Sequence, residues 1–213
     1  MTTVRVLEGL ENGDPSVRLR AALAVGTNPD PQYVDDLVRR CAVEPDFSVR
    51  EMLTWALTRH PSATTVPRLV DELGSERAQA RSQALHTLSK IGDRQAWPAI
   101  TRALLTDADD EVARSAWRAA VVLVPDGERL QLARVLATQL GRGGRETQLS
   151  LARALIALGE VSLPILVAAT TDPDPSVRRH AMAVERLWRN PDEGFAIEEA
   201  KRVVALGPSG REG

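Results

Sequence analysis

Apolar and polar residues follow the period of an amphipathic α-helix along most of the chain, in segments separated by short polar turns. The motif DPSVR at residues 14–18 returns at residues 174–178, and looser versions lie between the two. The last residue of each copy marks an anchor position, and the anchors are Arg18, Arg50, Arg81, Arg114, Gln148 and Arg178. Their spacings of 32, 31, 33, 34 and 30 residues are nearly constant, which predicts an array of similar stacked units.

Each copy of the motif is expected to begin a helix. Aspartate accepts hydrogen bonds from the free amides of a first helical turn, and Pro15 and Pro175 suit the first helical position. On a helical wheel, the residue before the anchor and those three, seven and ten positions after it share one mostly apolar arc, which predicts the core face. The tryptophans expected to pack in the core are Trp97, Trp117 and Trp188.

A second amphipathic segment precedes these helices, at residues 31–42, 63–73, 94–105 and 160–170. Three of the segments carry a proline at one repeat position, Pro67, Pro98 and Pro164, which we expect in the first helical turn. Each unit is therefore a helix–turn–helix of about 32 residues. The alternation and turn signals of β-strands do not occur.

The anchor arginines have two interpretations. They could form a ligand-binding ladder, but a structural role in holding the loops between repeats is favoured. An aspartate lies four residues before the arginine in four copies, and both residues change together to Gly144 and Gln148 in the fifth. This paired loss predicts that the two side chains interact, within one copy or with the next.

The segments VRLRAALAVG at residues 17–26 and LSKIGDRQAWPAI at residues 88–100 resemble HEAT-like repeats of the short type first noted in phycobilin lyases. The resemblance extends over roughly residues 3–206. It implies an all-α, right-handed α-solenoid of about six helical hairpins, with first helices on the convex side and second helices lining the concave side. It also implies a C-terminal capping helix at residues 195–206. We expect residues 1–206 to form a single HEAT-like repeat domain and residues 207–213 to be a disordered tail.

Composition narrows the possible functions. The 213 residues are 43% hydrophobic and 26% charged with a net charge of −2, which disfavours a strongly basic binder of nucleic acid or membrane surfaces. Of 27 basic residues, all but Lys90 and Lys201 are arginine, which a GC-rich genome explains more simply than phosphate recognition. One cysteine, no membrane-length apolar run and no secretory leader favour a cytoplasmic protein.

Residues one, two, five and nine positions after each anchor lie opposite the core arc and are expected to line the concave surface. The N-terminal part of this surface is unusually apolar. Its middle carries small side chains, at Ser115, Ala116 and Ala119, and its C-terminal part carries basic side chains, which include His180. Trp55 and Met52 are the predicted hot spot, because tryptophan is enriched among residues that dominate binding energy. The predicted partner-binding residues are Leu19, Arg20, Leu23, Glu51, Met52, Trp55, Gln83, His86, Arg153 and Arg179.

The sequence contains no recognisable active site. His60, His86 and His180 lack metal-ligand spacing, and Cys41 at an apolar helix position is interpreted as a buried, inert thiol. The glycine-rich residues 141–144 lack the lysine of a phosphate-binding loop and are interpreted as a longer turn between helices. We therefore expect no catalytic residues, no cofactor and no metal.

The leading hypothesis is a non-catalytic protein-interaction scaffold or adaptor that binds a protein or peptide partner in the concave groove. The alternative is a nucleic-acid-binding protein similar to the alkylpurine DNA glycosylases, with Arg20, Arg153, Arg179, His180 and Trp55 as contacts. The negative net charge and the scattered arginines argue against the alternative. Chromophore handling in the manner of phycobilin lyases rests on the repeat name alone. The identity of the partner stays open.

Overall fold

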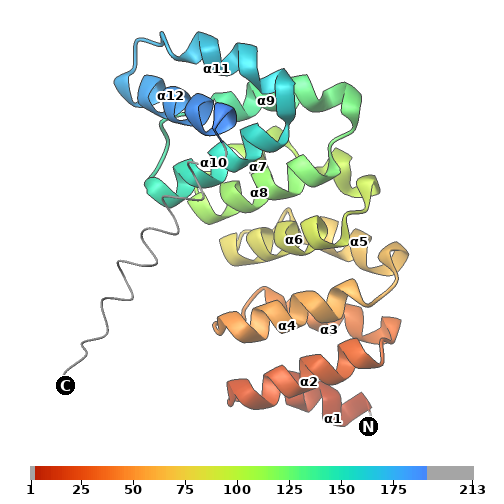
Figure 1. The fold of residues 1–213 in the computed structure, drawn as a ribbon. Helices are drawn as coiled ribbons and strands as arrows, with labels where there is room; N and C mark the ends of the chain where they lie inside the picture. The colour runs from red at the N-terminus through yellow and green to blue at the C-terminus, as the bar shows by residue number, and fades with distance from the viewer. Residues whose placement is uncertain (1–2, 191–213) are drawn as a thin grey trace, which may run out of the picture.

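The computed structural model describes residues 3–190, which form helical hairpins stacked in single file (Figure 1). No strand occurs within this range. The predicted all-α solenoid of six hairpins is thereby confirmed. The expected capping helix at 195–206 and the tail at 207–213 lie outside the described residues.

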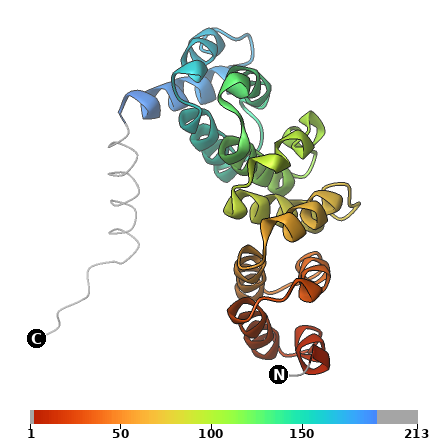
Figure 2. The same cartoon turned by 90° about the vertical axis from the view of Figure 1, so that its right-hand side faces the viewer.

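The second helices of the hairpins form one layer and lie on the inner side of the bend (Figure 2). They are α2 (Pro15–Thr27), α4 (Phe47–Thr58), α6 (Ala78–Ile91), α8 (Asp110–Leu123), α10 (Arg145–Ala157) and α12 (Pro175–Arg189). Each packs against the next, and the contacts between α2 and α4 and between α6 and α8 are the most extensive.

The first helices form the other layer and are shorter. They are α1 (Thr3–Leu10), α3 (Val34–Cys41), α5 (Ser62–Glu72), α7 (Arg102–Leu105), α9 (Arg129–Ala137) and α11 (Leu163–Ala169). Four of them follow a 3₁₀ turn, at Pro31–Tyr33, Arg94–Ala99, Asp126–Glu128 and Gly159–Ser162. The helices α1 and α9 had no counterpart among the segments singled out in the sequence.

The prolines of the first layer do not share one place. Pro164 lies in the first turn of α11, as predicted, whereas Pro67 lies inside α5 and Pro98 inside the 3₁₀ turn Arg94–Ala99. The helix expected at residues 94–105 is therefore broken, because a proline cannot donate the amide that a continuous helix requires. The chain restarts at α7, where the Thr101 hydroxyl accepts a hydrogen bond from the Leu104 amide.

Aspartate caps four helices of the second layer. The Asp14, Asp46, Asp109 and Asp174 carboxylates each accept a hydrogen bond from a backbone amide of the first turn. In the fourth repeat the cap is Asp109 rather than Asp110, so the anchor position is Ala113 and not Arg114. The predicted alignment of this repeat was therefore wrong by one residue. The corrected spacings are 32, 31, 32, 35 and 30 residues.

The anchor arginines hold the loops, as the favoured interpretation predicted. Arg18 donates to the carbonyl oxygens of Asn12 and Gly13, six and five residues earlier, at 2.8 and 3.0 Å. Arg50, Arg81 and Arg178 repeat this pair of bonds in their own loops. Gln148 keeps one of the two bonds, to the carbonyl oxygen of Gly143 at 3.2 Å. Each bond satisfies a carbonyl that no helix uses.

The predicted pairing of aspartate and arginine within one copy is wrong. The aspartates bond to backbone amides as caps, while Arg18 and Arg81 reach acids of the next repeat. Arg18 forms a two-bond pair with Glu44 at 2.7 Å, and Arg81 pairs with Asp107 at 3.1 Å. These ion pairs tie neighbouring repeats together.

The core runs between the two layers. The predicted core residues Leu53, Leu57 and Trp117 are fully buried, and the indole nitrogen of Trp117 donates to the carbonyl oxygen of Leu105 at 2.8 Å. Trp97 and Trp188 are half-buried, so their packing is only partial. An apolar layer sealed on both sides supplies most of the stability of such a stack.

Candidate binding surface

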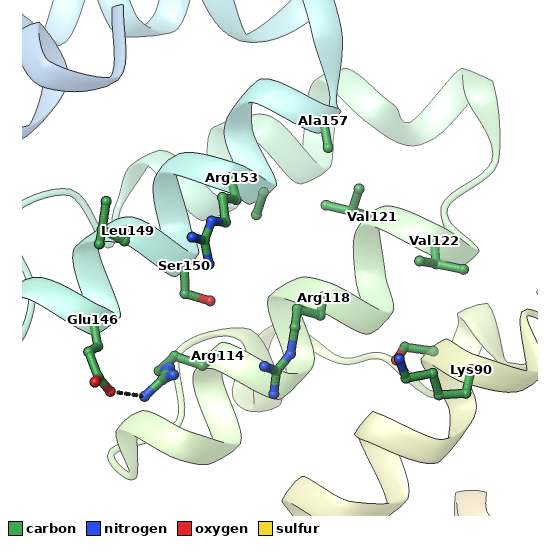
Figure 3. Close-up of a pocket in the computed structure, with 12 residues that line it drawn as sticks. Lys90, Arg114, Arg118, Val121, Val122, Glu146, Leu149, Ser150, Arg153 and Ala157 are labelled. Carbon is green, nitrogen blue, oxygen red and sulfur yellow. Dashed lines mark hydrogen bonds and ion pairs between the residues drawn. The ribbon is translucent and has the colours of Figure 1, made fainter. Parts of the chain in front are cut away.

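The outward side of α2, α4, α6, α8, α10 and α12 forms one continuous surface, which we call the second-helix face. Two hollows indent it. The first, of about 600 Å³, lies over α4, α6 and α8, and the second, of about 650 Å³, lies over α6, α8 and α10 (Figure 3). Both volumes lie within the range typical of ligand sites in proteins.

The corrected alignment of the fourth repeat changes the middle of this face. Ala116 and Ala119, predicted to line the groove, are buried. Ser115, also predicted there, lines the first hollow but is almost entirely buried. Arg114, half-buried, and the exposed Arg118 occupy the corresponding outward positions and line the second hollow. The middle of the face is therefore basic rather than small.

The second hollow carries four cationic side chains, and we call it the cationic hollow. They are Lys90 of α6, Arg114 and Arg118 of α8, and Arg153 of α10. Glu146 is the acidic residue that lines it, and its Oε2 lies 3.3 Å from Nη1 of Arg114. Figure 3 shows this pair at one rim and Arg153 extending from α10 toward α8. The rest of the lining is two serines, Ser89 and Ser150, and the apolar side chains of Val121, Val122, Leu149, Ala154 and Ala157.

The first hollow has mixed charge and holds three predicted site residues, Glu51, Gln83 and His86. Nε2 of His86 lies 3.2 Å from Oε1 of Glu51 without hydrogen-bond geometry, and Oε1 of Gln83 is likewise buried without a hydrogen-bond partner. Burial lowers the pKa of His86, and the nearby Arg118 and Lys90 add to this, while Glu51 opposes it. The lowered pKa favours the neutral form of His86 at pH 7.

The N-terminal end of the face is apolar, as predicted. The exposed fractions of Leu23 and Trp55 are 42% and 38%. Met52 and Leu19 are half-buried and pack against the core, so they present less surface than predicted. The charged side chain of Arg20 is exposed on α2 beside them.

The C-terminal end of the face differs from prediction at His180, which is buried. Its Nδ1 accepts a hydrogen bond from the Gly141 amide at 3.0 Å, so its Nε2 donates to the carbonyl oxygen of Gln148, also at 3.0 Å. This histidine holds the turn at residues 141–144 against α12 and α10. Arg179 is exposed, and its guanidinium reaches the hydroxyl of Ser176 on its own helix.

The structure therefore divides the predicted site. Leu23 and Trp55 lie on adjacent helices at one end, Glu51, Gln83 and His86 share the first hollow, and Arg179 stands apart on α12. Arg153 joins three cations that sequence reasoning missed, Lys90, Arg114 and Arg118. The adjacent aspartates at residues 109 and 110 could have revealed Arg114 and Arg118. Either aspartate can cap the helix, and a cap at Asp109 places both arginines on the outward side.

The described residues give little support to metal or thiol chemistry. Among residues 3–190, no cluster of three or more histidine, cysteine or acidic side chains has the geometry of a metal site. Burial raises the pKa of Cys41 to about 12, so its thiol stays protonated at neutral pH. Within the same range, no helix is long and apolar enough to cross a membrane.

Comparisons with known proteins support the repeat assignment. The family model for HEAT repeats matches residues 43–120. The chain is similar to a chain of the crystal structure of Kap121p bound to Pho4p, at 19% identity and a TM-score of 0.61, over 85% of this chain and 22% of that one. It is also similar to a chain in the complex of CpcE and CpcF of phycocyanin lyase from Nostoc sp. PCC7120, at 20% identity and a TM-score of 0.48, over 86% and 76% of the two chains.

The similarity to the first of these two structures concerns the fold alone. The chain spans about a fifth of the length of the first of the two solved chains, for which the match covers 22%. No match was found among curated protein sequences.

Proposed function

We propose that this chain, whose residues 43–120 match the family model for HEAT repeats, is a non-catalytic scaffold that binds a protein segment along the second-helix face. One observation carries the proposal. Trp55 is exposed on this face, yet its ring packs closely against Gly26 of the neighbouring repeat, a contact that restricts its rotation. An immobilised aromatic side chain loses little conformational entropy on binding, which is what a binding hot spot requires.

The immobilisation of Trp55 comes from Gly26 on α2. A Cβ atom at residue 26 would lie 2.3 Å from Cζ3 of the indole ring, so the ring lies directly on the glycine backbone. Leu23, one helical turn earlier on α2, extends the apolar surface. The stacked repeats thus present a preformed apolar platform, consistent with the protein or peptide partners that solenoid surfaces accommodate.

The mixed charge of the rest of the face favours a protein partner over nucleic acid. Glu51, Asp109 and Glu111 line the first hollow together with Arg50 and Arg118. A phosphate backbone is bound by a continuous basic stripe, and these carboxylates interrupt such a stripe.

Selection from a displayed library of random 12-residue peptides against the immobilised full chain tests the proposal. We expect enriched peptides whose affinity falls by about 2 kcal/mol, roughly thirtyfold, in Trp55→Ala. Leu130→Ala is the matched control, because Leu130 is similarly exposed, at 42%, but lies on α9 in the other layer. Urea unfolding of both variants separates lost binding from lost folding. A library that yields no binder, or binders that a folded Trp55→Ala variant retains in full, overturns the proposal.

A further inference from the structure

The cationic hollow holds positive charge that the protein itself does not neutralise. Among the residues that the structure describes, no carboxylate lies within ion-pair distance of Lys90 or Arg153. Arg118 has one acidic neighbour, Glu111, at 3.6 Å, and Glu111 is shared with Arg114 at 3.4 Å. Like charges held close together repel, so an anionic ligand would relieve a cost that the folded chain otherwise carries.

The hollow is also partly desolvated. Nε of Arg114 is buried without a hydrogen-bond partner. Val121 and Val122 line the hollow together with Lys90 and the arginines, and the exposed fraction of Val122 is 47%. A ligand for this site therefore needs anionic groups next to apolar groups.

We propose that the cationic hollow is the specificity site of the second-helix face and receives an acidic protein segment in which carboxylates are interspersed with apolar side chains. The carboxylates pair with Arg118, Arg153 and Lys90, and the apolar side chains cover Val121 and Val122. Guanidinium groups suit this ligand because they bind a carboxylate through two parallel hydrogen bonds. The inference rests on the proposed function and names the chemistry of its partner.

The surroundings of the cationic hollow favour a protein segment, rather than a nucleic acid, as the anionic ligand. The positive charge is confined to three helices, and the adjoining first hollow returns to mixed charge. No aromatic side chain lines the cationic hollow, so it offers no platform on which a base would stack. A short acidic segment matches both the extent of the charge and the apolar lining.

The test uses the library peptides selected on the full chain and measures their affinity by fluorescence anisotropy. The variant is the double charge reversal Arg118→Glu with Arg153→Glu. The matched control reverses Arg102 and Arg134, which are exposed on α7 and α9 of the other layer. Both variants change the net charge of the chain equally, so a general electrostatic effect would change the peptide affinity of both. Each peptide is also made with its Asp and Glu replaced by Asn and Gln, and a 20-base-pair DNA duplex is titrated in parallel.

We expect the enriched peptides to be acidic, to lose at least tenfold in affinity in the Arg118/Arg153 variant or in their amide form, and to be unaffected by the Arg102/Arg134 variant. Neutral or basic binders that tolerate both variants overturn this inference but leave the proposed function standing. Failure to select any peptide overturns both. Duplex binding that is tighter than peptide binding and is lost in the Arg118/Arg153 variant assigns the hollow to nucleic acid and also overturns the inference.

Discussion

The indole ring of Trp55 on α4 lies against Gly26 on α2, where a Cβ atom would be 2.3 Å from Cζ3 of the ring and 2.9 Å from the Cα atom of Ala56. The missing side chain lets two consecutive repeats approach closely. The same contact sets the direction of an exposed aromatic group on the second-helix face. Packing between repeats and presentation of the binding surface are therefore coupled at one pair of residues.

Gly26→Ala is expected to push the indole ring away and separate α2 from α4. Overpacking of this kind costs about 1–3 kcal/mol, and urea unfolding followed by tryptophan fluorescence measures it. Gly127→Ala is the control, because a Cβ atom there meets no atom within 4 Å. Equal stability of the two variants would show that the ring does not lie on α2.

Glu44 is a buried carboxylate that joins the first two repeats. Its exposed fraction is 0%, and it accepts hydrogen bonds from Arg18, Arg40 and the Asp46 amide. Burial by itself raises the pKa of Glu44, but these hydrogen bonds outweigh it and lower the pKa to about 2. The charged carboxylate is thus a stabilising element of the folded state.

Because the pKa of Glu44 is lower in the folded chain than in the unfolded chain, its contribution is fully present above about pH 4.5 and is lost as the pH falls toward 2. We expect Glu44→Gln to lose about 3 kcal/mol at pH 7, since it leaves the buried Arg18 without its counter-charge and Arg40 with Glu11 alone. The free energy of unfolding should then fall less steeply between pH 5 and pH 3 than in the natural chain. Glu76→Gln, an exposed change in the loop before α6, should alter neither quantity. Parallel pH profiles for Glu44→Gln and the natural chain would refute this account.

Arg142 performs in the fourth repeat the task that an anchor arginine performs elsewhere. It donates to the carbonyl oxygens of Asp107 and Ala108, six and five residues before Ala113, and pairs with Asp110 at 2.8 Å. Hydrogen bonds from charged groups contribute about 1.5–3 kcal/mol each. We therefore expect Arg142→Ala to destabilise the chain by at least about 2 kcal/mol in thermal or urea unfolding.

Arg145→Ala is the control for this loss, because Arg145 is exposed at the start of α10. Adding Ala113→Arg to the Arg142→Ala variant should restore part of the stability, since it returns a guanidinium to the anchor position. A double variant less stable than Arg142→Ala alone would show that the fourth repeat has no room for the anchor arginine.

Much of the fold could be predicted because it depends on local signals. Aspartate caps, the spacing of apolar residues and the near-constant period all act within a single repeat, and they identified the hairpins. The slip at the fourth repeat arose because Asp109 and Asp110 both satisfy the capping rule. Arg142, which replaces the missing anchor, comes from the following repeat, and no local pattern reveals that contact.

The candidate site was predicted less well, because exposure depends on how neighbouring repeats pack. Trp55 and Leu23 were identified correctly as exposed, since their outward positions follow from the helical period. A one-residue error in the alignment of α8 rotates the predicted direction of every side chain by about 100°. The prediction therefore placed small buried residues at the outward positions that Arg114 and Arg118 occupy. His180 was placed on the surface because its partners, Gly141 and Gln148, lie more than 30 residues away.

Photo-crosslinking of a selected peptide tests the central claim most directly. A benzoylphenylalanine residue replaces either Val122, exposed by 47% on the second-helix face, or Leu130, exposed by 42% on α9. If the partner segment lies along the second-helix face, irradiation should attach the peptide at position 122 and not at position 130. Attachment that is equal at both positions, or stronger at position 130, would contradict the claim.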